Sequence, residues 1–221
     1  MISENLNAIF KEIENGNNLG EKINLIGASK MNDAETINRA IECGLKIVAE
    51  NRVQEFLQKV DFVKNARWHF IGHLQTNKVK YLVGKVDVIH SVDSIKLAEE
   101  ISKVATKKGI IQKVLCEVNI GGELSKSGIS PENAEEVVKE IALLKGVKCV
   151  GLMAMLPHSQ DQELLKKLCL QMRAIYDKLK GDGFEFEYLS VGMSNDYKIA
   201  IQNGSNTIRI GSAIFGARNY L

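Results

Sequence analysis

Lys30 stands at the end of the apolar run INLIGAS, directly before a predicted helix. An ammonium group is costly to remove from water, so a lysine at this position calls for a chemical reason. One interpretation is a lysine at the rim of the fold that keeps its charge in solvent. The other is a nucleophile. Partial burial and a neighbouring cation lower the pKa of a lysine, which leaves more of its amine unprotonated and able to form a Schiff base with an aldehyde.

Two small-residue turns near the end of the chain have the composition of an anion site. The sequences are GMS at residues 192–194 and GS at residues 211–212, and each follows a strand-like run and precedes a helical segment. Glycine allows close approach to the backbone, hydroxyl and helix N–H groups donate hydrogen bonds, and the helix dipole favours negative charge. The turns predict a phosphate site that includes Ser194, Gly211 and Ser212, with ordinary tight turns and helix caps as the alternative.

Arg209 is the only charged residue in the segment NTIRIGSAIFG. It lies two residues before Gly211 and therefore on the same side of the predicted strand. We expect Arg209 to be the cation near Lys30, or else one half of a structural ion pair inside the fold. An amine, a cation and a phosphate turn on neighbouring strand ends together indicate a site for an aldehyde that carries a phosphate group.

Eight strand-like segments must position these residues, and helical patterns fill the gaps between them. Most of the segments are rich in Val and Ile with little polar alternation, which is typical of parallel strands covered on both faces. In chain order they read INLIGAS, LKIVAEN, RWHFIG, VDVIHSV, KVLCEVNI, VKCVGLM, FEYLSVG and NTIRIG. Eight strand–helix units predict an α/β fold with a single (β/α)8 TIM-type barrel, whose chemistry lies at the carboxyl ends of the strands. The alternative is a doubly wound open sheet, although no GxGxxG motif follows an early strand.

Helix boundaries also follow from the sequence. Five glycines stand just after helical segments, where a left-handed residue ends a helix: Gly44, Gly84, Gly109, Gly146 and Gly204. Asn32, with Glu35 three residues on, predicts a capping box. The segment MISENLNAIFKEIENGNN predicts an extra, amphipathic N-terminal helix rather than a signal peptide.

Composition limits the classes of protein. The chain has 221 residues, of which 45% are hydrophobic and 25% are charged, and we expect one domain over residues 1–221. A net charge of +2 does not favour nucleic acid as a partner. No run approaches the roughly 18 apolar residues of a membrane span. Four scattered cysteines without a CxxC motif predict buried free thiols, and we expect a cytoplasmic protein.

Several long segments carry a resemblance to a known family. They are LIGASK, VAENRVQE, WHFIGHLQTNK, SKSGI, GLMAM and LSVGMSNDYKIAIQNGSNTIRIGSAIFGARNY, and they extend over nearly the whole chain. With these segments the chain resembles the pyridoxal 5′-phosphate (PLP) homeostasis protein family, single-domain PLP-binding barrels related to the N-terminal domain of alanine racemase. The resemblance implies that PLP is the cofactor and that Lys30 holds its aldehyde as a Schiff base. It also implies that Ser194, Gly211 and Ser212 hold the phosphate, together with the backbone around Met193.

The resemblance further implies that Arg209 faces the pyridine nitrogen and that Asn51 lies near the polar edge of the ring. A permanently charged arginine disfavours protonation of that nitrogen. An unprotonated pyridine is a weaker electron sink than one paired with a carboxylate. This chemistry favours a protein that buffers or delivers PLP and has no obligatory catalytic reaction.

The alternatives are a racemase-like PLP enzyme that uses Lys30 and, less favoured, an aldolase-type barrel with a Schiff-base lysine. Racemisation generally needs an acid–base group on the opposite face of the ring, which in alanine racemase is a tyrosine of a second domain. Beyond the eighth strand only the tail GSAIFGARNYL follows, so we expect no second domain and a monomer. None of the five tyrosines is an obvious partner: Tyr81, Tyr176, Tyr188, Tyr197 and Tyr220.

Three further side chains could take part. Lys126, in GGELSKSGIS, is either an exposed loop lysine or a second amine that could hold PLP transiently on its way to a recipient apo-enzyme. His69 and His73 are four residues apart, but His69 lies in a strand-like run and no carboxylate accompanies the pair in the sequence. We therefore expect hydrogen bonds at the barrel mouth and no metal site.

Overall fold

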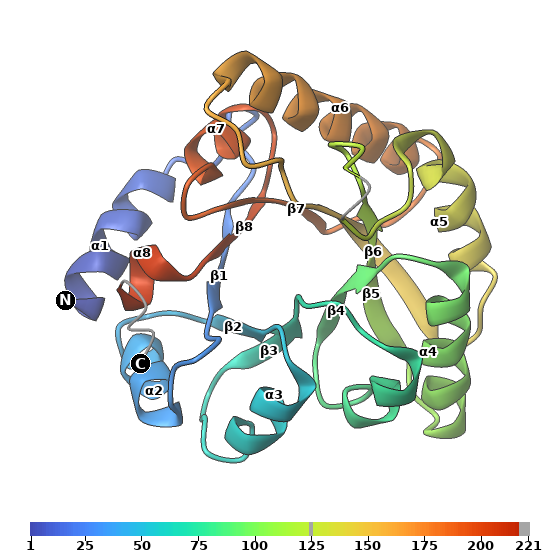
Figure 1. Ribbon diagram of the computed structural model, residues 1–221, viewed down its shortest axis with the longest axis horizontal. Helices are drawn as coiled ribbons and strands as arrows, with labels where there is room; N and C mark the ends of the chain where they lie inside the picture. The colour runs from blue at the N-terminus through green and yellow to red at the C-terminus, as the bar shows by residue number, and fades with distance from the viewer. Residues whose placement is uncertain (124–125, 217–221) are drawn as a thin grey trace.

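Eight parallel strands form a closed barrel in the computed structural model, which describes residues 1–123 and 126–216. The strands follow one another around the barrel in chain order, and β8 pairs with β1 to close it (Figure 1). Their bounds are β1 Asn24–Ala28, β2 Ile47–Glu50, β3 Arg67–Phe70, β4 Val88–Val92, β5 Gln112–Val118, β6 Val147–Ala154, β7 Tyr188–Met193 and β8 Thr207–Ile210. The predicted (β/α)8 barrel is confirmed, and the alternative prediction of a doubly wound open sheet is wrong.

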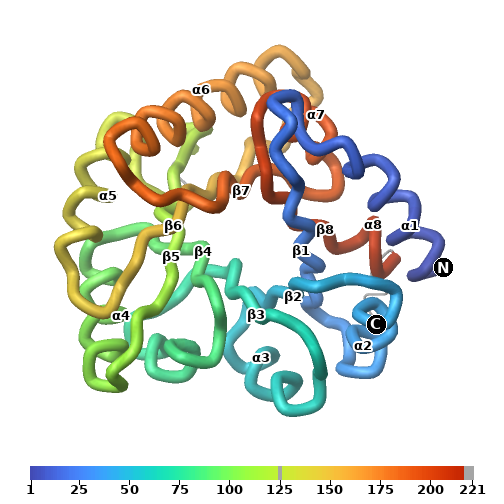
Figure 2. The backbone as a smooth tube through the Cα atoms, turned by 180° about the vertical axis from the view of Figure 1, so that it is seen from behind, coloured from blue at the N-terminus to red at the C-terminus, as the bar shows by residue number. Residues whose placement is uncertain are grey.

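Helices surround the barrel on the outside, as both ribbon and tube show (Figures 1 and 2). They are α1 Ile2–Ile13, α2 Ala34–Glu42, α3 Val53–Lys59, η1 Thr76–Tyr81, α4 Ile95–Lys107, η2 Pro131–Asn133, α5 Ala134–Ala142, α6 Gln162–Gly181, α7 Tyr197–Gln202 and α8 Ser212–Phe215, where η marks a 3₁₀ helix. The predicted extra N-terminal helix is α1, and the amide of Asn5 donates to the carbonyl of Ile214 in α8 at 3.0 Å. In the described part of the chain no helix is long and apolar enough to cross a membrane.

Local signals set most of the helix ends. The five predicted glycines all have positive φ, as helix ends of this type require. The predicted capping box at Asn32 is wrong by one residue. Asp33 is the N-cap of α2 and its carboxylate accepts the N–H of Thr36 at 2.8 Å, because a carboxylate also interacts favourably with the positive end of the helix.

Two layers of side chains make up the core. The larger layer lies between the strands and the helices and includes fully buried Phe56, Leu97 and Ile101. The smaller layer fills the barrel interior. The ring of His69 on β3 lies 5.9 Å from that of Tyr188 on β7, and this contact crosses the interior because β3 and β7 are not neighbours in the sheet.

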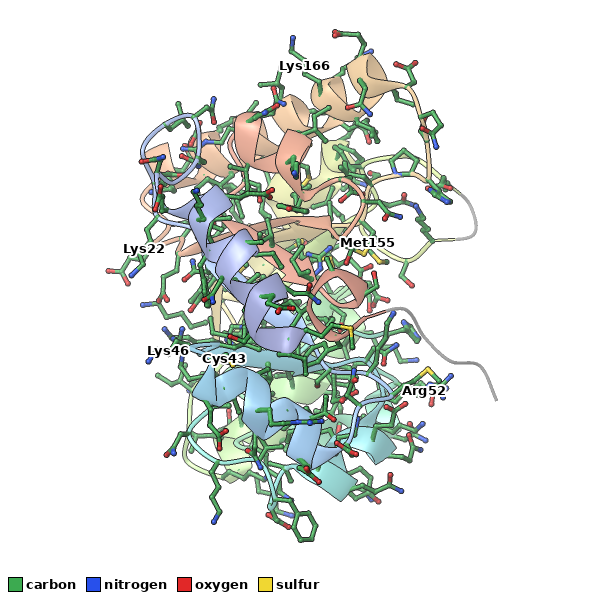
Figure 3. All side chains as sticks on the ribbon, turned by 90° about the vertical axis from the view of Figure 1, so that its left-hand side faces the viewer. Lys22, Cys43, Lys46, Arg52, Met155 and Lys166 are labelled. Carbon is green, nitrogen blue, oxygen red and sulfur yellow. The ribbon has the colours of Figure 1, made fainter. Side chains whose placement is uncertain are left out.

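The two ends of the barrel are distinct in the side view of Figure 3. Lys22 and Lys46 precede β1 and β2, and both lie on the left of that view. Arg52 follows β2 and Met155 follows β6, and both lie further to the right. The right-hand end therefore carries the loops after the strands, where TIM-type barrels have their functional groups.

Gly151 on β6 lies directly against the backbone of β7. A Cβ atom at Gly151 would overlap the backbone oxygen of Tyr188, its partner in the parallel register. We predict that Gly151→Ala lowers the free energy of unfolding by about 3 kcal/mol, because neither strand can move without disturbing the barrel. The measurement is urea unfolding followed by circular dichroism.

The matched control is Gly181→Ala. Gly181 ends α6, and a Cβ atom there would meet nothing within 4 Å. We expect this variant to be as stable as the wild type or about 0.5 kcal/mol more stable, because alanine restricts the unfolded chain. Equal stability of the two variants would contradict the assignment of the close approach.

Candidate functional site

A cavity of about 550 Å³ lies at the carboxyl end of the barrel. Loops after β1, β2, β3, β6, β7 and β8 contribute to its lining. All seven residues that the sequence singled out for the site line this one cavity: Lys30, Asn51, Met193, Ser194, Arg209, Gly211 and Ser212. The sequence therefore predicted which side chains meet, while their individual roles stay predictions at this point.

The two predicted anion turns lie side by side. The N–H of Gly211 donates to the hydroxyl oxygen of Ser194 at 3.3 Å, which joins the turn after β7 to the turn after β8. The N–H of Met193, one of the expected anion donors, instead donates to the carboxylate of Asp196 at 2.5 Å. The helices that follow these turns are short: α7 has six residues and begins only at Tyr197, and α8 has four residues. Ser194 and Ser212 therefore contribute hydroxyl groups, rather than helix N-termini, to this wall of the cavity.

Arg209 is buried at the inner end of the cavity and only 4% of it is exposed. Its guanidinium donates to the carbonyl of Ser190 at 2.7 Å, to the hydroxyl of Ser190 at 2.6 Å and to the carbonyl of Ala154 at 2.9 Å. Burial lowers the pKa of Arg209 to about 10, with Asp196 and Glu117 opposing the shift. Arg209 therefore stays charged at neutral pH, and its described hydrogen-bond partners are neutral oxygens rather than the carboxylate of an ion pair.

A polar chain of side chains continues from Arg209 into the barrel interior. The hydroxyl of Ser190 lies 3.2 Å from Nδ1 of His90, and Nε2 of His90 lies 2.9 Å from Nδ1 of His69. Burial lowers the pKa of His69 to about 3 and moves the pKa of His90 in the same direction, so both rings are neutral. The charge of Arg209 adds to this lowering of the pKa at His90.

The prediction that His69 lies at the barrel mouth is therefore wrong. His69 points into the barrel and is fully buried, whereas His73 lines the cavity and its Nδ1 lies 3.3 Å from a carboxylate oxygen of Asp93. The motif around His69 and His73 did not reveal this carboxylate because Asp93 belongs to the next strand–helix connection. Among the described residues, no three or more His, Cys, Asp or Glu side chains form a group that could hold a metal ion.

Lys30 and Asn51 lie on the cavity wall formed by the loops after β1 and β2. The side-chain amide oxygen Oδ1 of Asn51 is buried and has no hydrogen-bond partner among the described residues. A buried acceptor of this kind costs free energy unless a ligand or water donates to it. The wall is therefore built to receive a hydrogen-bond donor or a polar ring substituent.

Sequence reasoning missed a cluster of charged side chains behind this wall. Lys59 is 9% exposed, and its ammonium lies 2.7 Å from Glu50 Oε1 and 3.3 Å from Glu55 Oε2. The carboxylates belong to the segment VAENRVQE, which the sequence marked only as part of a family resemblance. The i,i+4 spacing of Glu55 and Lys59 was the one available signal.

Lys126 does not line the cavity but lies beside one of its walls. Its ammonium donates to the carbonyl of Leu156, a lining residue, at 3.1 Å and pairs with Glu123. Its side chain is only 25% exposed, so the interpretation as an exposed loop lysine is wrong. A second, transient amine site at Lys126 stays a prediction.

The described tyrosines do not reach the cavity. Tyr176 donates to the carbonyl of Phe186, Tyr188 lies inside the barrel, and Tyr197 bonds to Glu12. Tyr81 is not among the lining residues either. Tyr220, the fifth tyrosine, lies outside the described residues.

Comparison with known proteins agrees with this fold. Residues 6–219 match the family model of the alanine racemase N-terminal domain. The pyridoxal phosphate homeostasis protein of Aquifex aeolicus (strain VF5) is 46% identical over 199 residues, which cover 89% of this chain and 87% of the relative. The protein of the same name from Escherichia coli (strain K12) is 35% identical and covers 90% of this chain and 88% of its own length.

This chain belongs to the pyridoxal phosphate homeostasis protein family. The family predicted from the sequence is confirmed. PipY from Synechococcus elongatus has a similar solved structure without PLP, with a TM-score of 0.88, 30% identity and coverage of 98% of this chain and 100% of that chain. The PLP-bound structure of PipY has a TM-score of 0.86 and 29% identity over the same shares. An alanine racemase of Clostridium difficile 630, at 18% identity and a TM-score of 0.79 over 98% of this chain and 56% of that chain, shares the fold.

Glu117 is a buried carboxyl on β5, and its charge interacts with Arg209. Burial raises its pKa to about 7, Asp93 adds to the shift, and Arg209 opposes it. An unfolded glutamate titrates near 4.5. Between pH 5 and 7 the folded protein therefore retains a proton that the unfolded chain has lost, and stability falls as the pH rises.

We predict that Glu117→Gln removes this pH dependence, because the amide is shaped like the protonated carboxyl and does not titrate. Between pH 5 and pH 7 the wild type should lose about 2 kcal/mol of unfolding free energy through Glu117, and the variant should not lose it. Urea unfolding of both proteins at the two pH values measures the difference. A constant difference between them at pH 5 and pH 7 would contradict the raised pKa.

Proposed function

We propose that this protein binds PLP in the cavity at the carboxyl end of the barrel and buffers or delivers it within the cell. The observation that carries the proposal is the meeting of an amine, a permanent cation and a hydroxyl-bearing turn on one cavity, at Lys30, Arg209 and Ser212. Membership of the pyridoxal phosphate homeostasis family supports it, as does the PLP-bound structure of PipY.

The lining fits PLP chemically. The phosphate needs hydrogen-bond donors, and the hydroxyls of Ser194 and Ser212 line the cavity beside Gly211, where the absence of a side chain allows close approach. The polar edge of the ring needs a hydrogen-bond partner, and the buried oxygen of Asn51 lacks one among the described residues. A volume of about 550 Å³ is within the range of cofactor pockets.

Lys30 is the residue that we assign to covalent binding. PLP supplies an aldehyde when bound, and the amine of Lys30 holds it through a Schiff base. Met193 contributes to the phosphate wall through the shape of its turn, since its N–H is engaged by Asp196.

Arg209 sets the chemical character of the site. Its pKa of about 10 keeps it charged at neutral pH, and we place it opposite the pyridine nitrogen. A fixed positive charge there keeps the nitrogen unprotonated, and a neutral ring withdraws electrons weakly. The site therefore withdraws electrons from bound PLP only weakly, which suits holding the cofactor more than activating it, and we propose that the protein has no obligatory catalytic reaction.

The racemase-like alternative has less support. It needs an acid–base group facing the lysine across the ring, and none of the described tyrosines lines the cavity. The names of the curated relatives describe homeostasis and not a reaction. A cavity open at the barrel end suits transfer to an apo PLP-dependent enzyme.

The proposal also covers the domain organisation, the oligomeric state and the cellular compartment of the protein. We propose one PLP-binding domain that acts as a cytoplasmic monomer. The cysteines support a reducing compartment, because Cys43, Cys116, Cys149 and Cys169 are all free and three of them are buried. Light scattering of the purified protein tests the oligomeric state.

The test of the function is the visible absorbance of purified protein soaked in PLP. A Schiff base gives a yellow protein, and we predict that Lys30→Ala abolishes the visible band. Lys126→Ala is the matched control, since it removes a lysine beside the same cavity and should keep the band. A colourless wild-type protein without an adduct mass would contradict the proposal.

The same loaded protein is then given a panel of L-amino acids, while racemisation and transamination are followed. We expect no sustained turnover. Turnover that disappears in Lys30→Ala would overturn the assignment as a carrier and favour the racemase-like alternative.

A further inference from the structure

A buried charge cluster lies directly behind the turn that carries Lys30. It consists of Glu50 at the end of β2 and of Glu55 and Lys59 on α3. Glu50 is fully buried, and the Lys59 side chain is 11% exposed. None of the three lines the cavity, so the assignment of the cofactor site leaves their presence unexplained.

The cluster bonds to the main chain on both sides of Lys30. Before the lysine, the hydroxyl of Ser29 donates to Glu50 at 2.9 Å, and the ammonium of Lys59 donates to the carbonyl of Ser29 at 3.3 Å. After the lysine, the N–H of Met31 donates to Glu55 at 2.9 Å. Lys59 connects the two sides, since it bonds to both carboxylates.

The backbone at Met31 shows why such bonds are needed. Met31 has a φ of 64°, a left-handed conformation that costs free energy for a residue with a side chain. Met31 is 58% exposed, so packing of its side chain does not explain the conformation. The N–H of Asn32 closes the turn by donating to the carbonyl of Ser29 at 3.1 Å, and the bond from the N–H of Met31 to Glu55 holds the same turn from outside.

Burial of these charges is costly. Desolvation raises the pKa of Glu50 in spite of the opposing hydrogen bonds from Lys59 and Ser29, and its second oxygen has no partner among the described residues. A buried ion pair usually adds little stability compared with apolar side chains of the same volume, but it can specify one geometry. The geometry that this cluster specifies is that of the Lys30 turn.

We propose that Glu50, Glu55 and Lys59 are positioning residues that fix the amine of Lys30 at the cavity wall for covalent attachment of PLP. The proposal rests on the proposed function. Attachment forms a C=N bond between the amine and the aldehyde carbon, while the aldehyde oxygen leaves as water with the two hydrogens of the amine. A loosened turn leaves the phosphate and ring contacts in place but moves the amine away from the aldehyde carbon.

Two ligands distinguish a misplaced Lys30 amine from general damage to the cavity. PLP can bond to Lys30, whereas pyridoxine 5′-phosphate, which has an alcohol in place of the aldehyde, reports only on the noncovalent contacts. In Glu55→Gln we expect the affinity for PLP to fall about tenfold, the equivalent of one charged hydrogen bond, and the visible band to form more slowly. The affinity for pyridoxine 5′-phosphate should stay within about twofold of the wild type.

A second variant and a control complete the experiment. Glu50→Gln with Lys59→Met removes the ion pair without leaving one charge buried alone, and it should show the same split between the ligands. Should this double variant fail to fold, Glu55→Gln decides the matter, because its side chain is 20% exposed. Glu135→Gln breaks a salt bridge to Lys178 on the helical exterior and should change neither affinity.

The outcomes are distinguishable. Unchanged PLP affinity in the variants, or an equal loss for both ligands, would overturn the positioning role while the proposed function stands. A wild-type protein that binds PLP without a visible band would overturn covalent attachment and this inference with it.

Discussion

The pairing of the last strand with the first is the constraint on which the site depends. The register of β8 against β1 places Arg209 beside Ile26 and Ile210 beside Gly27. The next residue, Gly211, then lies close to Ala28, since a Cβ atom on it would meet the Ala28 oxygen at 3.5 Å. Closure of the barrel therefore brings Lys30 and the hydroxyl-bearing turn to one wall although they are far apart in the sequence. A slip of this register would separate them.

Charge and polarity below this wall are unusual for a barrel interior, which is commonly filled by branched apolar residues. Here Arg209, His90 and Glu117 are all buried, and the charge of Arg209 lowers the pKa values of both His90 and Glu117. The guanidinium retains its charge because carbonyls and a hydroxyl accept from it, and the imidazoles are neutral. The floor of the cavity thus presents one fixed positive charge, which suits the retention of a cofactor more than its activation.

Much of this architecture could be predicted from the sequence, because hydrophobic runs and helix-end glycines are local signals. The barrel, the N-terminal helix and the meeting of seven site residues all followed from such signals and from family motifs. The signals failed where a contact joins distant segments. Asp33 rather than Asn32 caps α2, and Asp93 reaches His73 from another connection. The Glu50–Lys59 pair could not be foreseen, since only the packing of α3 on β2 buries it.

The proposed role of the cavity depends most directly on which lysine bonds to the cofactor. The measurement is borohydride reduction of the PLP-loaded protein, followed by proteolysis and mass spectrometry of the peptides. We predict a phosphopyridoxyl group on the peptide that contains Lys30. A modification found only on Lys126, or on no lysine at all, would contradict it.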